Sequence, residues 1–333
     1  MKHDLARRLL GRRPRHMPGA AEYEIIHRRA GVSVRYYAPA GAPENGAAPR
    51  TPLVLVPPLA ADIRIYDQRT RHSLVAYLSA RGFDLYLVDW GWPTRAEDRR
   101  NLTDYFAALL PEMLNRVRFH SGRHRLCLHG WRLGGLLALC YAAISPAGDL
   151  AGLVLLDTCI DYAAEPVGAA VAGGLRRRAR RWRRLAGLRA GHLPVSALHL
   201  PSWLQATARQ AVLGPAQPPD DDALRARAYP GGVVADVIDH LWTDNLLAAG
   251  RLPMAHASAG LAAVRAPILF IADADHPVCS PGCGARLAAV VSSRDIECEW
   301  THGDPLHPAC GALMARRSWS RVADWLIARD TRP

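Results

Sequence analysis

Residues 127–139 read C-L-H-G-W-R-L-G-G-L-L-A-L, and this stretch decides the fold. The apolar residues before its turn predict a strand over 125–129, and the apolar run after it predicts a helix over 134–144. Three glycines lie in or next to the turn: Gly130, Gly134 and Gly135. Glycines at such positions let a strand and a helix approach closely, and a sharp turn between them lifts one side chain above the sheet. In this chain that side chain belongs to Arg132.

Short apolar runs alternate with amphipathic segments on both sides of this turn, which predicts a mostly parallel sheet with helices on both faces. The expected strands are 33–37, 52–57, 83–88, 125–129, 150–156, 267–272 and 295–300. The expected helices are 72–80, 102–119, 134–144, 284–291 and 319–328. The alternation stops over 163–260, which contains several Pro/Gly turns and no clear strand. This layout predicts an α/β-hydrolase fold with a helical cap inserted into it.

The same pattern predicts how the chain is divided. Residues 1–50 form a basic, Pro/Gly-rich lead-in, and 51–162 form the N-terminal half of the core. Residues 163–260 form the cap or lid, and 261–333 form the C-terminal half of the core.

Composition excludes several classes of protein. The chain has 333 residues, of which 50% are hydrophobic and 22% charged, as in ordinary globular proteins. No apolar run reaches the roughly 18 residues of a membrane span, so we expect no transmembrane segment. The Arg-rich N-terminus lacks the apolar core of a signal peptide, and we expect a cytoplasmic protein. The seven cysteines form no C-x-x-C pair. Cys279 and Cys283 are the closest two and have no matching doublet, so no metal site is expected.

The formal charge of +12 has a local origin. Seven arginines fall within nine residues: Arg176, Arg177, Arg178, Arg180, Arg181, Arg183 and Arg184. Such a cluster can hold a polyanion, an anionic membrane surface or a phosphorylated substrate, or it can be one face of a solvated helix. We do not expect nucleic acid as a partner.

Several motifs together resemble those of the polyhydroxyalkanoate synthases, above all their short catalytic subunits, which work with a second subunit. The turn at 130–135 matches the family's G-x-C-x-G-G in its glycines. The other matching segments are LVLVPP at 53–58, LYLVDWGWP at 85–93, LTDY at 102–105 and DHPV at 275–278. The resemblance runs from about residue 52 to residue 325 and is strongest over 52–162.

The resemblance implies a site in which a Cys thiolate takes the acyl group from a hydroxyacyl-coenzyme A. A His deprotonates the Cys, and an Asp holds the His. The Cys position falls on Arg132, whose guanidinium only donates hydrogen bonds and cannot form an acyl intermediate. The acid falls on Asp275, with Asp273 as the fallback. The resemblance places the oxyanion hole at Leu133 and Leu59, and the elbow glycines at Gly130 and Gly134.

The base is open between two residues. The family has G-H-x-G after the last strand, and neither His302 nor His307 is followed by x-G in register. If Cys310-Gly311 aligns with that x-G, the position of the base holds Ala309. We place His307 slightly ahead of His302.

Three hypotheses on function follow. The first is a polyhydroxyalkanoate-synthase-like protein without catalysis, which acts in polyester and acyl metabolism by binding an acyl ligand, a polymer granule or a synthase subunit. The second is an active acyltransferase, polymerising hydroxyacyl groups from coenzyme A, or a hydrolase, with a nucleophile such as Cys279 or Ser280 outside the elbow. The third is a polyanion-binding module that uses the arginine cluster. No cofactor is expected. Acyl-coenzyme A is a possible ligand, and a homodimer or a synthase subunit is a possible partner.

Four single residues carry further expectations. Arg132 should lie under the cap and either pair with Asp275 or hold an anion. His129 should be a packed strand residue, and Trp90 and Trp92 should be structural or line an acyl pocket.

Overall fold

The computed structural model describes most of the core of the fold and part of the cap region. The described residues are 21–40, 50–59, 63–67, 73–91, 93–164, 169–170, 173–174, 229–254, 260–276, 279–302 and 312–330. Several residues named above lie outside these ranges: Trp92, the arginines of 176–184, Pro277, Val278, His307, Ala309 and Cys310.

Eight strands form one sheet, in the order β1-β2-β4-β3-β5-β6-β7-β8. They are β1 (Glu24–Arg29), β2 (Val32–Tyr37), β3 (Leu53–Val56), β4 (Leu85–Asp89), β5 (Leu126–Trp131), β6 (Leu150–Leu156), β7 (Ile268–Asp273) and β8 (Ile296–Thr301). β2 runs antiparallel to both of its neighbours, and the strands from β4 to β8 are parallel. The mostly parallel sheet that the sequence predicts is confirmed.

The strand β1 was not expected from the sequence. It reads E-I-I-H-R-R and lies at the edge of the sheet, where its side chains are exposed or half-buried. It pairs with β2 through the two residues Ala30 and Gly31, which have φ of 49° and 82°. Two consecutive positive φ values are typical of the tight hairpin turn that suits the twist of antiparallel strands.

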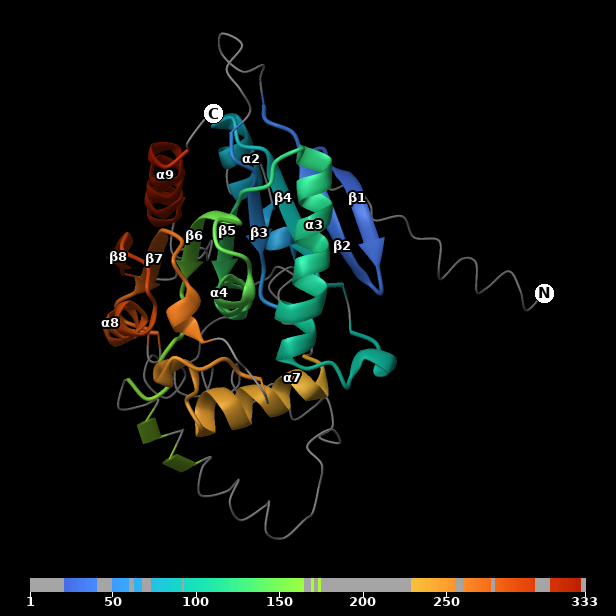
Figure 1. Cartoon of the computed structure of the whole chain (residues 1–333). Helices are drawn as coiled ribbons and strands as arrows, with labels where there is room; N and C mark the ends of the chain where they lie inside the picture. Colours follow the sequence, from blue (N-terminus) through green and yellow to red (C-terminus); the bar gives the residue numbers. More distant parts are fainter. Residues whose placement is uncertain are drawn as a thin grey trace, which may run out of the picture.

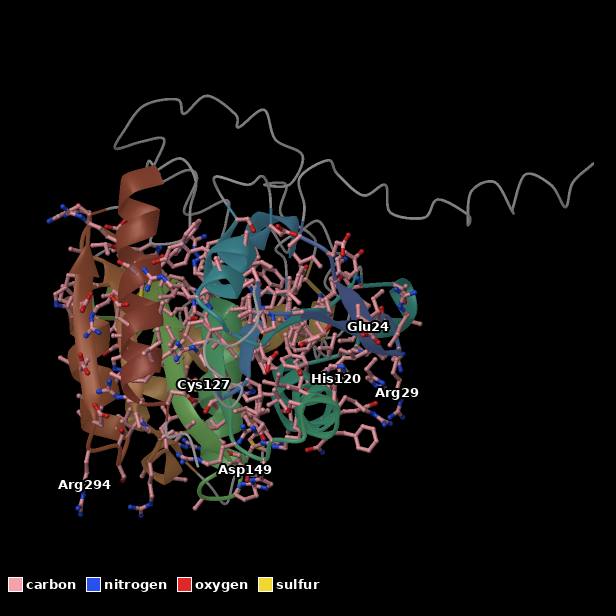
Figure 2. The ribbon with its side chains drawn as sticks, turned by 90° about the horizontal axis from the view of Figure 1, so that it is seen from above. Glu24, Arg29, His120, Cys127, Asp149 and Arg294 are labelled. Atoms are coloured by element: carbon pink, nitrogen blue, oxygen red, sulfur yellow. The ribbon has the colours of Figure 1, made fainter. Side chains whose placement is uncertain are left out.

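Helices cover both faces of the sheet (Figure 1). They are α2 (Leu74–Ala80), α3 (Leu110–Ser121), α4 (Leu133–Ile144), α7 (Gly231–Asp236), α8 (Pro281–Val290) and α9 (Ala312–Ala328). Alternate residues of β3 show the two sides: Val54 and Val56 belong to the cluster that includes α3, α4 and α8. Leu53 and Leu55 belong to the cluster with α2 and α9. In the view from above, Cys127 lies in the middle of the sheet, and Glu24 and Arg294 lie toward opposite edges (Figure 2).

Three helices differ from the expected ranges. The helix expected over 102–119 contains a π-helical turn, Asp104–Leu109, directly before α3. Pro111 follows this turn, and because proline has no N–H, it cannot donate the regular helical hydrogen bond. α8 begins three residues earlier than expected, because Ser280 caps it through the N–H of Gly282 and Pro281 occupies its first position. α9 begins seven residues earlier than expected.

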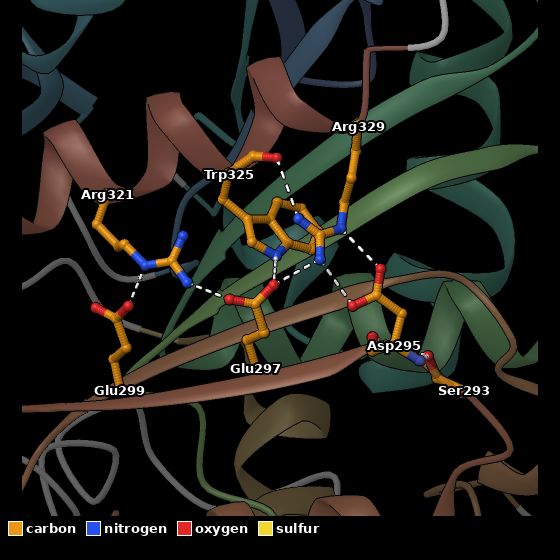
Figure 3. Close-up of polar contacts among 7 residues, drawn as sticks. All are labelled: Ser293, Asp295, Glu297, Glu299, Arg321, Trp325 and Arg329. Carbon is orange, nitrogen blue, oxygen red and sulfur yellow. Dashed lines mark hydrogen bonds and ion pairs between the residues drawn. The ribbon is translucent and has the colours of Figure 1, made fainter.

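A network of charged side chains fastens α9 to the edge strand β8 (Figure 3). Arg329 donates two hydrogen bonds of 2.8 Å to the carboxylate of Asp295 and also contacts Glu297. The indole of Trp325 donates to Glu297 at 3.1 Å, and Arg321 pairs with the same carboxylate. The network connects the last helix to the outermost parallel strand.

The segment of the expected cap that contains α7 contacts the chain that follows β4. The N–H of Gly231 donates to Asp98 Oδ1 at 2.8 Å, and Asp236 Oδ2 accepts from the N–H of Leu102 at 2.8 Å. Asp98 and Leu102 both follow the carboxyl end of β4, so α7 lies at the sheet edge where the candidate site is expected. Among the described helices, none is both long enough and apolar enough to cross a bilayer.

Candidate functional site

Arg132 occupies a strained turn between β5 and α4. Its backbone has φ 50° and ψ −118°, a region that non-glycine residues rarely adopt. The backbone holds this conformation: the N–H of Arg132 donates to Leu156 O at 2.7 Å, and its carbonyl accepts from the N–H of Leu136 at 3.1 Å. A turn with this geometry presents the residue at its tip above the sheet.

Close contacts with the neighbouring backbone and with Thr158 exclude side chains at the three glycines around Arg132. A Cβ on Gly134 would lie 2.1 Å from the carbonyl oxygen of Val56, and a Cβ on Gly130 would lie 2.4 Å from Cα of Gly135. A Cβ on Gly135 would lie 1.9 Å from Thr158 Oγ1. No side chain fits at these positions without a shift of the backbone or of Thr158.

The guanidinium of Arg132 lies among buried aromatic and thiol groups. Its Cζ is 4.9 Å from the ring centroid of Trp131, which is buried. Burial raises the pKa of Tyr229, and the positive charge of Arg132 opposes that rise. Hydrogen bonding to Cys283 and burial raise the pKa of Cys279, and Arg132 again acts in the opposite sense. Arg132 is therefore close to both the chain that precedes α7 and the chain that precedes α8.

The structure brings Asp275 together with His302. Asp275 follows β7 and His302 follows β8, and their Oδ2 and Nδ1 atoms are 3.1 Å apart. Both side chains are largely exposed, at 75% and 81%. Asp273 Oδ1 accepts the N–H of Asp275 at 3.0 Å. Of the two states expected for Arg132, the buried ion pair with Asp275 is wrong, because Asp275 is largely exposed and pairs with His302.

The expected oxyanion residues lie on two adjoining segments. Leu133 is the first residue of α4, and Leu59 is buried shortly after β3. The contact of Gly134 with the end of β3 brings these segments together. Trp90 fixes the β3 loop, since its indole donates to Pro57 O at 2.8 Å within the buried core. This contact favours the structural interpretation of Trp90.

Asp157 is a site residue that the sequence analysis missed. It directly follows β6, has φ 44° and is 3% exposed. Its Oδ1 accepts the N–H of Asp273 at 3.0 Å, and its charge contributes to the raised pKa of Cys279. The sequence did contain a signal for Asp157, because an acidic residue directly follows the apolar run 150–156. In parallel sheets, functional groups gather at the carboxyl ends of the strands.

Three cysteines gather beside Arg132. Cys159 Sγ lies 3.9 Å from Cys283 Sγ, and Cys279 also hydrogen-bonds to Cys283. The N–H of Cys279 donates to His276 Nδ1 at 2.8 Å. Within the described ranges, no group of three or more His, Cys, Asp or Glu side chains could hold a metal ion.

Ser280, the other residue considered as a nucleophile outside the elbow, serves as the cap of α8, as described above.

His129 is a packed strand residue. It is 1% exposed in the middle of β5, and burial lowers its pKa to about 4. The imidazole is therefore neutral near pH 7.

Comparison with known proteins gives partial matches at the level of sequence. The chain is 34% identical over 113 residues to the poly(3-hydroxyalkanoate) polymerase subunit PhaC of Haloferax mediterranei. This match covers 32% of this chain and 23% of the relative. It is 33% identical over 131 residues to the PhaC subunit of Allochromatium vinosum, covering 39% of this chain and 36% of the relative. The matched segment therefore spans roughly a quarter to a third of these relatives.

Solved structures match over most of the chain at low identity. A thermostable carboxyl esterase from Bacillus coagulans has a TM-score of 0.60 at 14% identity and covers 94% of this chain and 99% of its own. A monoglyceride lipase from Saccharomyces cerevisiae has a TM-score of 0.56 at 14% identity and covers 95% of this chain and 98% of its own. At this identity the likeness concerns the fold.

The family model described as the alpha/beta hydrolase fold matches residues 51–227, which is more than half of the chain. Together with the strained turn between β5 and α4 and the eight-stranded sheet, this match shows that the chain belongs to the α/β hydrolase fold family.

Proposed function

We propose that this protein is a polyhydroxyalkanoate-synthase-like member of the family that binds an acyl anion and does not form an acyl-enzyme at the elbow. The observation that carries the proposal is Arg132 at the tip of the strained turn. The resemblance to polyhydroxyalkanoate synthases places their nucleophilic cysteine at this position. The sequence similarity to PhaC subunits over about a third of the chain supports the acyl part of the proposal.

The chemistry of arginine supports the proposal that no acyl-enzyme forms at the elbow. A guanidinium stays protonated and has no lone pair to attack a thioester. Removal of the nucleophile from a Ser or Cys triad typically costs on the order of 10⁶ in turnover. Neither neighbour of Arg132, Trp131 or Leu133, has a nucleophilic atom.

The surroundings of Arg132 support the binding of an anion. Arg132 is at the N-terminus of α4, a 12-residue helix whose first N–H groups favour negative charge. Arginine binds carboxylate and phosphate through paired, charge-assisted hydrogen bonds. We therefore propose the carboxylate of a hydroxyacyl acid, or the hydroxyacyl-coenzyme A itself, as the ligand.

Isothermal titration calorimetry with 3-hydroxybutyrate and with 3-hydroxybutyryl-coenzyme A tests this proposal. We expect Arg132→Gln to weaken binding at least about tenfold, in line with the loss of one charge-assisted pair. Arg294→Gln is the matched control, since Arg294 is exposed next to β8 and away from the elbow. Equal affinities for the parent and Arg132→Gln would contradict the proposal.

A second candidate function is an active acyltransferase or hydrolase with its nucleophile outside the elbow. The Asp275–His302 hydrogen bond and the thiols near Arg132 are the observations that favour it. Incubation with a labelled hydroxyacyl-coenzyme A followed by intact mass separates the candidates. Covalent addition that disappears in Cys279→Ser would establish the second candidate, and no addition supports the first.

The finer partners are further proposals. Association with a polyester granule, with an active synthase subunit or with a second copy of the chain rests on the resemblance alone. A cytoplasmic location stays a prediction. Polyanion binding by the arginines of 176–184 stays a prediction, because that cluster lies outside the described residues.

A further inference from the structure

Two separate segments bring three cysteines together. Cys159 lies in the loop after β6, while Cys279 precedes α8 and Cys283 lies in its first turn. The Sγ atoms of Cys159 and Cys283 are 3.9 Å apart, and Cys283 Sγ is 3.4 Å from the carbonyl oxygen of Asp161. The cluster is formed by the fold, since more than a hundred residues separate Cys159 from the other two.

The three thiols differ in how readily they ionise. Hydrogen bonds from Cys159 and Cys279 lower the pKa of Cys283 below its ordinary value. The position of Cys283 in the first turn of the ten-residue helix α8 acts in the same direction. Burial raises the pKa of Cys159, and the hydrogen bond to Cys283 raises it further. Of the three thiols, Cys283 is therefore the one whose ionised form the neighbouring thiols favour.

The exposure of the cluster restricts what can react with it. Cys159 is partly exposed, while Cys279 and Cys283 are 1% and 0% exposed. We therefore expect oxidation by a small oxidant that enters beside Cys159, and none by a bulky disulfide such as oxidised glutathione. Thiolates are the forms that react with peroxides.

We propose that Cys159 and Cys283 form a reversible disulfide when the protein meets hydrogen peroxide. The Cys283 thiolate attacks one peroxide oxygen, the O–O bond breaks, and the departing hydroxide takes a proton to leave as water. The resulting sulfenic acid is attacked by the Cys159 sulfur, which forms the S–S bond and releases a second water. Two thiols are oxidised and one peroxide is reduced to two waters.

The disulfide requires only local movement. A disulfide has an S–S length of about 2.05 Å, so the two sulfurs must approach from 3.9 Å through rotation of their side chains. The bond would tie the loop after β6 to α8. Cys159 is three residues before Tyr162, whose ring packs on Trp242 with centroids 5.0 Å apart. The oxidised form would therefore fasten the start of the cap region to the core, a property that goes beyond the proposed acyl binding and does not depend on it.

Peptide mapping of the folded parent protein tests this inference. The protein is treated with hydrogen peroxide, its remaining thiols are alkylated without reduction, and the digest is analysed by mass spectrometry. We expect a peptide pair that links Cys159 to Cys283, lighter by two hydrogens and separated by dithiothreitol. Five cysteines should stay alkylated. Because this measurement needs no substitution, it does not depend on whether a variant folds.

Variants then assign the role of each thiol. Cys159→Ser and Cys283→Ser should abolish the linked pair, and Cys279→Ser should keep it but slow its formation, since Cys279 donates to the thiolate. Cys298→Ser is the matched control, because Cys298 is exposed on β8 outside the cluster, and it should behave like the parent. Alkylation of both Cys159 and Cys283 after peroxide treatment, or a linkage that appears only in denaturant, would overturn the proposal.

Discussion

Asp275 and His302 are joined by a hydrogen bond of 3.1 Å between Oδ2 and Nδ1, across the loops that follow β7 and β8. A carboxylate that orients an imidazole is the acid–base pair that activates a nucleophile in catalytic triads. In this chain the pair coexists with an arginine at the tip of the elbow turn.

Arg132→Cys should introduce a thiol at the elbow turn that reacts slowly with a hydroxyacyl-coenzyme A. Recovery should be weak, because the Asp275–His302 pair is largely exposed and water competes for its hydrogen bond. The accumulation of acyl-protein by intact mass measures the rate. If His302 serves as the base, the double variant Arg132→Cys/His302→Asn should acylate about 10²-fold more slowly. Identical rates in the two variants would remove His302 from consideration as the base.

Gly134→Ala should destabilise the protein by about 3 kcal/mol or more. Its methyl group would meet the backbone carbonyl of Val56 at 2.1 Å, and a strand backbone cannot move aside as a flexible side chain can. Urea denaturation gives the free energy of unfolding. Gly174→Ala is the control, since a Cβ at Gly174 meets nothing within 4 Å and should leave that free energy nearly unchanged. A tolerated Gly134→Ala would show that β3 and α4 are farther apart than the structure has them.

His129 should make the protein less stable as the pH falls. Its pKa is about 4 in the folded chain and about 6.5 when exposed, so the unfolded chain binds the proton first. The stability is complete above pH 6.5 and decreases toward pH 4, by about 3 kcal/mol in total. His129→Leu should flatten this part of the curve of unfolding free energy against pH. Parallel curves for the parent and His129→Leu would contradict the burial of His129.

Arg329→Gln should destabilise the contact of α9 with β8 by about 1 kcal/mol, the upper range for partly exposed ion pairs. Hydrogen bonds from Arg329 lower the pKa of Asp295. Burial alone would raise the pKa of Glu297, and hydrogen bonds from Arg321 and Arg329 lower it overall. A lowered carboxyl pKa stabilises the fold above the unfolded value near pH 4, and this contribution disappears as the pH falls further.

The measurement for Arg329 is urea denaturation at pH 7 and at pH 3, with and without 1 M salt. The difference from the parent should shrink at the lower pH and in high salt. Arg81→Gln is the control, because Arg81, at the end of α2, makes a single ion pair with Asp324 of α9, at 3.1 Å, and this pair is more exposed than the network. A larger effect from Arg81 than from Arg329 would show that the network in Figure 3 does not hold α9.

The sequence predicted the central strands well, because buried parallel strands are nearly continuous apolar runs. β6, expected over 150–156, has these bounds in the structure. β1 could not be found in this way, since an edge strand with exposed side chains needs no apolar run. The start of α8 was readable from Ser280 and Pro281 as a cap followed by a first-turn proline, but the expected helix began at the apolar residues instead.

The site was predictable where local sequence determines the backbone. The glycines of the elbow imply close packing, and the structure gives Arg132 a strained turn. The meeting of Asp275 with His302, and of Cys159 with Cys283, depends on strands that are adjacent in the sheet and distant in the chain. No pattern within a single segment contains that information.

Two hydrogen bonds between backbone atoms, with Leu156 and with Leu136, hold Arg132 in its turn. The glycines that make room for the turn belong to neighbouring positions. These contacts are open to any residue at position 132, so the backbone of the elbow does not require an arginine there. One substitution at this position can add or remove a reactive group while these backbone contacts remain in place.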